Sequence, residues 1–285
     1  MKSASLKDHT KNLIFMYDKI SIDKFNKTTF HLDYTAKVYR QKDLVALIRD
    51  TVPYFALTEQ EFKELESIEI SRTAWSRISK ARKDKKGDYG ELLLFLIMIV
   101  YYDAPKFVTK VRLRSSVGMQ VNGYDCAHFT IENNEPILWL GESKFHQSFS
   151  TALTESFNSL NEHCKILYTT DEISILKPNI EINKDFENDF LKLKSVFAGK
   201  SIDKIKFRIP VLLTYDSKTI KNNDDINSKF KNDLENELLI HHQNIEKKDI
   251  SNELKNIEFI FFIFPLETVS NIKTDLELIE NAMRI

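Results

Sequence analysis

The stretch VNGYDCAHFTIENNEPILWLGESKF, residues 121–145, decides how the middle of this 285-residue chain folds. It contains two runs of strand-forming residues, 121–131 and 137–145, on either side of a short polar loop. A loop that turns at residues 133–134 would join the two runs as an antiparallel hairpin. We therefore predict two neighbouring strands of one sheet.

The register of this hairpin determines which charged residues meet. If Glu132 faces Glu135, then Asp125 lies directly opposite Glu142, and cross-strand partners share one face of the sheet. Lys144 lies on the same face as Glu142, because side chains two residues apart on a strand point the same way. The prediction depends on this register, since a slip of one residue would separate the charges.

The charges of this patch predict a divalent metal ion. Two opposed carboxylates, Asp125 and Glu142, repel each other, and a cation bound to both removes the conflict. Oxygen ligands favour Mg²⁺, for which Mn²⁺ can substitute, and such an ion acidifies a bound water and polarises a phosphate. Lys144 would orient that water or stabilise charge on the phosphate. We therefore expect phosphodiester hydrolysis, with Asp125, Glu142 and Lys144 as catalytic residues.

The neighbouring sequence predicts helices and a further strand around the hairpin. Residues 87–102 are apolar all round after Glu91, which is typical of a buried helix, and Asp88 is its candidate N-cap. Glu91 is a candidate third ligand of the metal ion. A strand is expected at 106–115 and an amphipathic helix at 148–164.

A simpler interpretation is that these charges only pair with one another. Asp125 and Glu142 could form ion pairs with Lys144, or with Arg112 and Arg114 on the preceding strand.

Two histidines lie near the patch. His128 has the wrong strand parity for the face of Asp125, whereas His146 shares the parity of Lys144. A histidine in such a place more often packs or contacts a phosphate than binds a metal ion.

Other charged motifs need no functional explanation. Three further E-x-K triplets, which begin at Glu61, Glu246 and Glu253, lie in helical or polar stretches where solvated charges suffice. The triplet 216–218, Asp-Ser-Lys, follows a second apolar strand and is expected to cap a turn.

The rest of the chain is α/β by pattern, with no internal repeat or linker. We predict an α/β fold with a mixed central sheet flanked by helices. Residues 1–86 would form an N-terminal mixed region, 87–165 the catalytic core and 166–285 a C-terminal extension of the same domain. Further strands are expected at 30–39, 205–215 and 257–264, and helices at 44–48, 59–68, 73–83, 229–247 and 268–283.

Composition limits the class of protein. Hydrophobic residues make up 42% and charged residues 29%, which is ordinary for a soluble globular protein. The net charge of −1 argues against unassisted tight binding of nucleic acid, although residues 72–114 hold eleven Lys or Arg against four Asp or Glu. Two cysteines fit a reducing compartment. Neither a signal peptide nor a membrane-spanning run is visible, so a cytoplasmic location is expected.

The order of these features resembles the core of the PD-(D/E)XK nucleases. The acid-bearing helix has Glu91, the first hairpin strand has Asp125, the second has the E-x-K motif that begins at Glu142, and an amphipathic helix follows. Tyr124 stands where the family's motif has proline, so the match rests on the order of these elements and their charged residues. The resemblance covers residues 87–164 and implies a metal-dependent nuclease with a restriction-endonuclease-like fold.

Residues 87–102 and 141–160 also resemble the DUF1837 family, whose members include HamA, the effector of the Hachiman anti-phage system, and the related AbpA. This resemblance implies a bacterial defence nuclease that acts on DNA in the cytoplasm. It also implies a partner, the superfamily 2 helicase HamB, which restrains the nuclease until phage-associated or damaged DNA is engaged.

Two other functions stay open. A non-catalytic adaptor of this fold would dock a helicase or nucleic acid without cleaving it, although a degenerate fold has no reason to keep buried charges. An RNase of the same fold is the second alternative, because nothing in the sequence separates RNA from DNA.

Overall fold

The computed structural model describes residues 3–20, 24–81, 89–104, 106–109, 125–133, 135–167, 206–250 and 257–283. Helices and strands alternate along this chain. In order they are α1 (Ser3–Lys11), β1 (Ile14–Ile20), β2 (Asn26–Leu32), β3 (Tyr34–Thr35), β4 (Val38–Tyr39), α2 (Gln41–Ala56), α3 (Glu59–Glu64), α4 (Ser67–Ala81), α5 (Tyr89–Tyr101), β5 (Lys106–Thr109), β6 (Cys126–Glu132), β7 (Glu135–Phe145), α7 (Phe149–Leu167), β8 (Lys206–Asp216), α10 (Lys218–Lys221), α11 (Ser228–Glu246), β9 (Ile257–Leu266) and α12 (Val269–Ala282).

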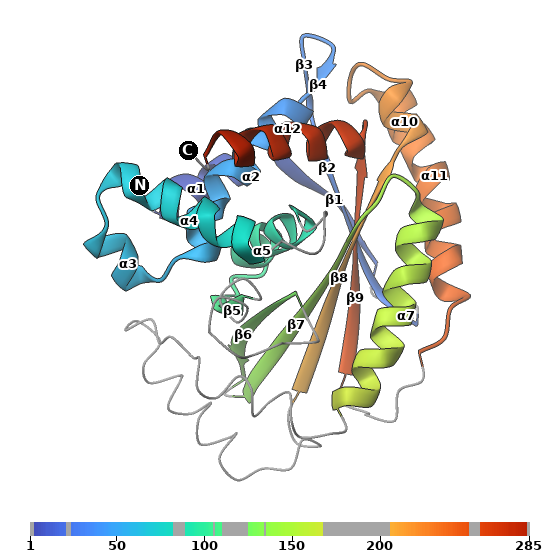
Figure 1. Cartoon of the computed structure of the whole chain (residues 1–285). Coiled ribbons are helices and arrows are strands. Elements are labelled where there is room, and N and C mark those ends of the chain that lie inside the picture. Colours follow the sequence, from blue (N-terminus) through green and yellow to red (C-terminus); the bar gives the residue numbers. More distant parts are fainter. Residues whose placement is uncertain are drawn as a thin grey trace.

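One seven-stranded sheet, in the order β1-β2-β9-β8-β7-β6-β5, joins strands from all parts of the chain. Strands β2, β9, β8 and β7 run parallel, whereas β1, β6 and β5 pair antiparallel with their neighbours. Helices α1, α2, α5 and α12 lie on one side of the sheet, and α7 and α11 lie on the other (Figure 1). The predicted α/β fold with a mixed central sheet is confirmed, and it is consistent with a PD-(D/E)XK-like core.

The predicted hairpin register is confirmed where the structure describes it. Glu132 pairs with Glu135, and the pairing continues to Cys126 opposite Gly141. Asn133 turns the chain with a positive φ of 51°. The ladder ends with the amide of Asp125, which donates to the Gly141 carbonyl over 2.8 Å. Asp125 therefore bonds to the residue that already pairs with Cys126, and its predicted place opposite Glu142 stays a prediction.

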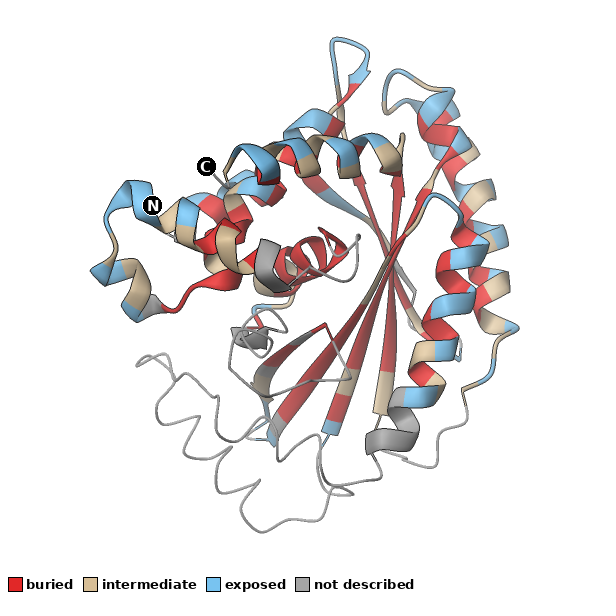
Figure 2. Ribbon diagram, in the orientation of Figure 1, coloured by how far each residue is buried: buried red, intermediate tan, exposed pale blue. Residues whose placement is uncertain are grey.

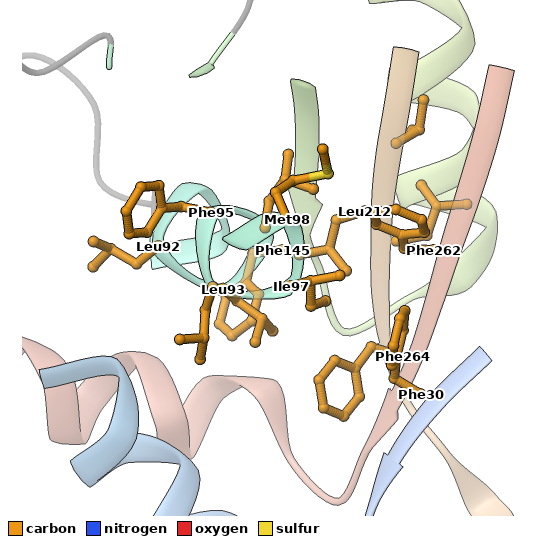
Figure 3. Packing of buried hydrophobic residues seen from close by; sticks show 14 of the residues in the cluster. Phe30, Leu92, Leu93, Phe95, Ile97, Met98, Phe145, Leu212, Phe262 and Phe264 are labelled. Atoms are coloured by element: carbon orange, nitrogen blue, oxygen red, sulfur yellow. The ribbon is translucent and has the colours of Figure 1, made fainter. Parts of the chain in front are cut away.

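The main core lies between α5 and the sheet. Helix α5 is buried along almost its whole length, as the red ribbon in Figure 2 shows, because sheet and helices surround it. Its apolar side chains meet Phe145, Leu212 and Phe262 on the sheet (Figure 3). Phe30 packs edge-on against Phe262, with ring centroids 5.7 Å apart. Each large side chain buried in this way contributes about 1.5–3 kcal/mol.

Several sequence predictions for the outer elements are wrong in detail. The strand expected at 30–39 ends at Leu32, and a small β3–β4 hairpin follows. Ala36 and Lys37 both have positive φ at its tip, the backbone of a tight two-residue turn. The helix expected at 44–48 extends over Gln41–Ala56.

The helix expected at 59–68 ends at Glu64 as α3, and the helix expected at 73–83 begins earlier, at Ser67, as α4. Thr58 and Glu61 form a capping box at the start of α3, so that each side chain binds the other's backbone amide. Leu65 then adopts an extended backbone and ends α3 before α4 begins. Helix α1 and strand β1 were not predicted at all. The helices and strands predicted after residue 205 are confirmed to within two residues.

None of the helices in the described ranges is both long and apolar enough to cross a lipid bilayer.

Candidate functional site

Glu142 and Lys144 lie at the carboxyl end of β7. The Nζ atom of Lys144 is 2.7 Å from the Oε1 atom of Glu142, and Glu142 is buried. The two side chains share one face because the strand alternates. In the parallel register Glu142 lies beside Val211 of β8, which lies beside Phe261 of β9. The pair is therefore set into the apolar face that α7 covers, where Phe157 of α7 stacks on Phe261.

Asp125 is held against the same strand by Ser143. Its Oδ2 atom accepts hydrogen bonds from the amide of Ser143 over 2.8 Å and from the hydroxyl of Ser143 over 2.9 Å. The β6–β7 ladder ends here, so among the described residues the amide of Ser143 has no partner strand on that side. The carboxylate of Asp125 accepts its hydrogen bond instead. The middle residue of the E-x-K motif thus fixes the aspartate. Sequence reasoning missed this role, because strand alternation points Ser143 to the other face.

The charge of Lys144 is stabilised by its neighbours. Burial lowers the pKa of Lys144, but the carboxylates of Glu142, Asp125 and Glu155 raise it by more, so the net pKa lies above its ordinary value. Lys144 therefore stays an ammonium near neutral pH. The ammonium is 2.7 Å from the buried carboxylate of Glu142, and the buried carboxylate of Asp125 also raises its pKa.

Glu91 is buried in the first turn of α5, whose start packs closely on β7. A Cβ atom added at Gly90 would lie 3.1 Å from both the Cβ of Phe145 and the Oγ of Ser143. The start of α5 therefore approaches β7 from the face of Ser143 and Phe145, whereas Glu142 points to the opposite face. A metal-binding role for Glu91 stays a prediction.

The residues present fit a hard divalent cation. Within the described ranges, no three His, Cys, Asp or Glu side chains form a group that could hold a metal ion. Mg²⁺ does not need such a group, because it typically binds one or two carboxylates and keeps several waters. The buried carboxylates of Asp125 and Glu142 provide that number.

The two histidines near the patch have different surroundings. His128 is buried on the face of α5, where its ring lies 5.6 Å from Phe95 and its Nδ1 is 2.9 Å from the Ala104 carbonyl. His146 follows β7, and its Nε2 atom is 2.9 Å from the Oε2 atom of Glu155 on α7. The parity assigned to both residues from sequence agrees with these contacts.

The family model of HamA matches residues 8–278, nearly the whole chain. The protein belongs to the HamA family. A search of curated proteins found no match. Family membership confirms the resemblance seen in the sequence and associates the protein with Hachiman anti-phage defence.

The D-x-K triplet 216–218 of this HamA protein was expected to cap a turn, and it binds the starts of two helices. The hydroxyl of Ser217 accepts from the amide of Ile220 and caps α10. The Oδ1 atom of Asp216 accepts from the amide of Val269 at the start of α12, over 2.8 Å. Its Oδ2 atom is 3.1 Å from the Nζ of Lys221. This motif joins helices to the sheet and contributes no site.

The basic segment 72–114 lies only partly within the described residues of the HamA fold. Asp88, Arg112 and Arg114 fall outside them, so the predicted N-cap and the alternative ion pairs remain predictions. Arg77 forms an ion pair with Glu61 and donates to the Ala56 carbonyl, which ties α4 to the preceding segment. Arg77 therefore has a structural partner.

Proposed function

We propose that this HamA-family protein is a metal-dependent nuclease that hydrolyses DNA phosphodiester bonds. The observation that supports this most is the placement of two buried carboxylates, Asp125 and Glu142, with Lys144 2.7 Å from Glu142. Charges at the buried end of a central strand are costly unless they are paired or serve a function. Two buried carboxylates are the oxygen ligands that a hard divalent cation prefers.

Each side chain would have a distinct task. Asp125 and Glu142, with Glu91 as a candidate third ligand, would hold Mg²⁺ or Mn²⁺. When bound, the ion supplies an acidified water and polarises the scissile phosphate. Lys144 would stabilise negative charge that develops on the phosphate, and its ammonium state suits that task.

Ser143 would preserve the geometry of the site. Its amide and hydroxyl both bind Oδ2 of Asp125, so the carboxylate cannot rotate freely. A group fixed before the substrate arrives loses little conformational entropy in the reaction.

The proposal includes control by a partner. Family membership supports a role in Hachiman defence, and the sequence resemblance implies the superfamily 2 helicase HamB as the partner that delivers DNA and restrains cleavage. The formal net charge of −1 favours a nuclease that depends on such delivery, because unassisted DNA affinity comes largely from Lys and Arg contacts to phosphate.

Cleavage of supercoiled and linear DNA by the purified chain tests the proposal. It is measured with Mg²⁺, with Mn²⁺ and with chelator, alone and together with the helicase. We expect metal-dependent cleavage and a loss of at least about 100-fold for Lys144→Ala, because one stabilising donor commonly contributes that much. Lys229→Ala serves as the matched control, because Lys229 pairs only with Asp233 and Asn223 on the surface in the described structure.

Two outcomes would contradict the proposal in different ways. DNA binding without metal-dependent cleavage, alone or with the helicase, would favour the non-catalytic adaptor. Cleavage of RNA but not of DNA under the same conditions would favour an RNase of this fold.

A further inference from the structure

The pair His146–Glu155 lies at the outer edge of the cluster described above. Both Lys144 and His146 face Glu155 of α7: Glu155 raises the pKa of Lys144, and its Oε2 atom lies 2.9 Å from Nε2 of His146. Glu142, Lys144, His146 and Glu155 therefore line one side of the sheet. Neither His146 nor Glu155 has a task in the function proposed so far.

Exposure rises steadily along these four residues. The exposed fraction of the side chain is 5% for Glu142, 18% for Lys144, 30% for His146 and 49% for Glu155. The cluster thus opens toward solvent at the histidine. A phosphodiester that approaches Lys144 from solvent would pass the imidazole, so His146 lies where a substrate and its attacking water would arrive.

The contact with Glu155 fixes the orientation of the imidazole. If Nε2–H donates to the carboxylate, the neutral ring carries its lone pair on Nδ1. The backbone of His146 is held as well, because the hydroxyl of Thr214 on β8 donates to its carbonyl over 3.3 Å. The charged group that the described structure places against the ring is Glu155 of α7, which also acts on Lys144.

Hydrolysis requires an acceptor for the proton of the attacking water. The ammonium of Lys144 has no lone pair and cannot accept a proton. Asp125 already accepts two hydrogen bonds from Ser143, and Glu142 accepts from Lys144. The remaining bases of the cluster are His146 and Glu155, and of these the imidazole is the group that most often acts as a general base.

We propose, on the basis of the nuclease function above, that His146 accepts the proton of the attacking water and that Glu155 positions it. As the water oxygen bonds to phosphorus, its O–H bond breaks and the proton passes to Nδ1 of His146. The bond from phosphorus to the leaving sugar oxygen breaks, and that oxygen takes a proton from solvent. His146 then returns its proton to solvent.

A pH profile of single-turnover DNA cleavage tests this role. Wild type, His146→Ala and Glu155→Gln are compared with Mg²⁺ between about pH 5 and pH 8, the range in which histidine changes charge. General-base catalysis contributes about 100-fold or more, so we expect a loss of that size for His146→Ala and a flat acidic limb. Added imidazole should restore part of the rate of His146→Ala and none of the rate of Lys144→Ala.

Controls separate this role from a structural one. An exposed ion pair contributes about 0–1 kcal/mol, so both variants should melt close to wild type. His9→Ala, at an exposed histidine of α1, should keep the rate and the profile of wild type. For Glu155→Gln we expect a smaller loss of rate than for His146→Ala, because the imidazole remains.

The inference is overturned if wild type cleaves DNA with metal and His146→Ala cleaves at the wild-type rate. In that case the pH profile of the variant would keep its acidic limb, and added imidazole would not change its rate. The nuclease proposal would survive that result. If instead wild type shows no metal-dependent cleavage, alone or with the helicase, the nuclease proposal fails and this inference fails with it.

Discussion

Ser143 shows how a residue of unremarkable type organises the candidate site. It lies between the two charged residues of the E-x-K motif and points to the opposite face. Yet its amide remains in the plane of the sheet, where the ladder to β6 has ended, and Asp125 accepts from it. A carboxylate bonded to a backbone amide and a hydroxyl is held more firmly than one held by charge alone.

A second residue, His241, makes the folding stability depend on pH. His241 of α11 stacks on Phe149 of α7, with ring centroids 3.8 Å apart. Within the described part of the chain, neither of its ring nitrogens has a hydrogen-bond partner. Burial lowers the pKa of His241 to about 4; Glu237 raises it and His242 lowers it further.

This shift predicts a loss of stability in mild acid. The folded-state pKa lies below the ordinary histidine value, so the unfolded chain binds the proton more readily between about pH 6.5 and pH 4. The contribution of neutral His241 is present above that window and is lost as the pH falls through it. Between about pH 7 and pH 5 we expect wild type to lose about 2 kcal/mol more than His241→Phe, measured as unfolding free energy in urea.

Phenylalanine keeps the stacking on Phe149 and removes the titration, so the comparison isolates the proton. His9→Phe at an exposed position controls for adding an aromatic ring. Equal pH dependence in wild type and His241→Phe would contradict the assignment.

At the scale of elements, the contact between α5 and β7 depends on Gly90. An added Cβ would lie 3.1 Å from the Cβ of Phe145, which is fixed in a central strand, and 3.1 Å from the Oγ of Ser143, which is bonded to Asp125. Neither neighbour is a flexible chain end, so the helix itself would have to move.

Gly90→Ala should therefore destabilise the protein. Overpacking costs about 1–3 kcal/mol, and the better helix propensity of alanine offsets less than about 1 kcal/mol of it. We expect a net loss of about 1 kcal/mol in thermal or urea unfolding, with slower DNA cleavage because Ser143 would shift Asp125. Combining Gly90→Ala with Ser143→Ala gives a double-mutant cycle. If the losses of stability are additive in that cycle, the side chains at positions 90 and 143 do not interact.

The elements also show what local sequence can and cannot predict. The hairpin of β6 and β7 was predictable in register from Glu132 to Cys126, because a polar loop between two apolar runs leaves one simple pairing. Helix α5 was predictable because an all-round apolar helix must be buried. Strand β1 (Ile14–Ile20) was not, because its sequence IFMYDKI alternates poorly and its ladder is interrupted between Met16 and Asp18.

At the scale of the whole molecule, the sheet order was beyond reach of local patterns. Strand β2 pairs in parallel with β9, more than two hundred residues later in the chain. Nothing in either strand alone specifies the other, since β2 (NKTTFHL) is mostly polar whereas β9 (IEFIFFIFPL) is mostly apolar. The seven-stranded sheet takes strands from all three predicted regions, residues 1–86, 87–165 and 166–285.

Phe30 tests whether this shared sheet unfolds as one unit. Its ring centroid lies 5.2 Å from Tyr101 of α5, 5.7 Å from Phe262 and 6.4 Å from Phe264 of β9, so it joins the first, middle and last thirds of the chain. Truncating a buried phenylalanine costs about 3–5 kcal/mol. We expect Phe30→Ala to lower the stability by that amount in a single transition, detected alike by far-UV circular dichroism and tryptophan fluorescence.

The matched control is Phe15→Ala, at a phenylalanine of β1 that is 37% exposed, for which a loss below about 1 kcal/mol is expected. Coincident transitions are required because Trp75 and Trp139 report on α4 and β7, whereas circular dichroism reports on every element. If the N-terminal region were a separate domain, the unfolding transitions of Phe30→Ala measured by circular dichroism and by fluorescence would no longer coincide. The fluorescence of Trp139 would then keep the wild-type midpoint while part of the dichroism moved to lower denaturant. Such a split would show that β7 and its carboxylates are stable without β1 and β2, and that the continuous sheet does not make the molecule cooperative.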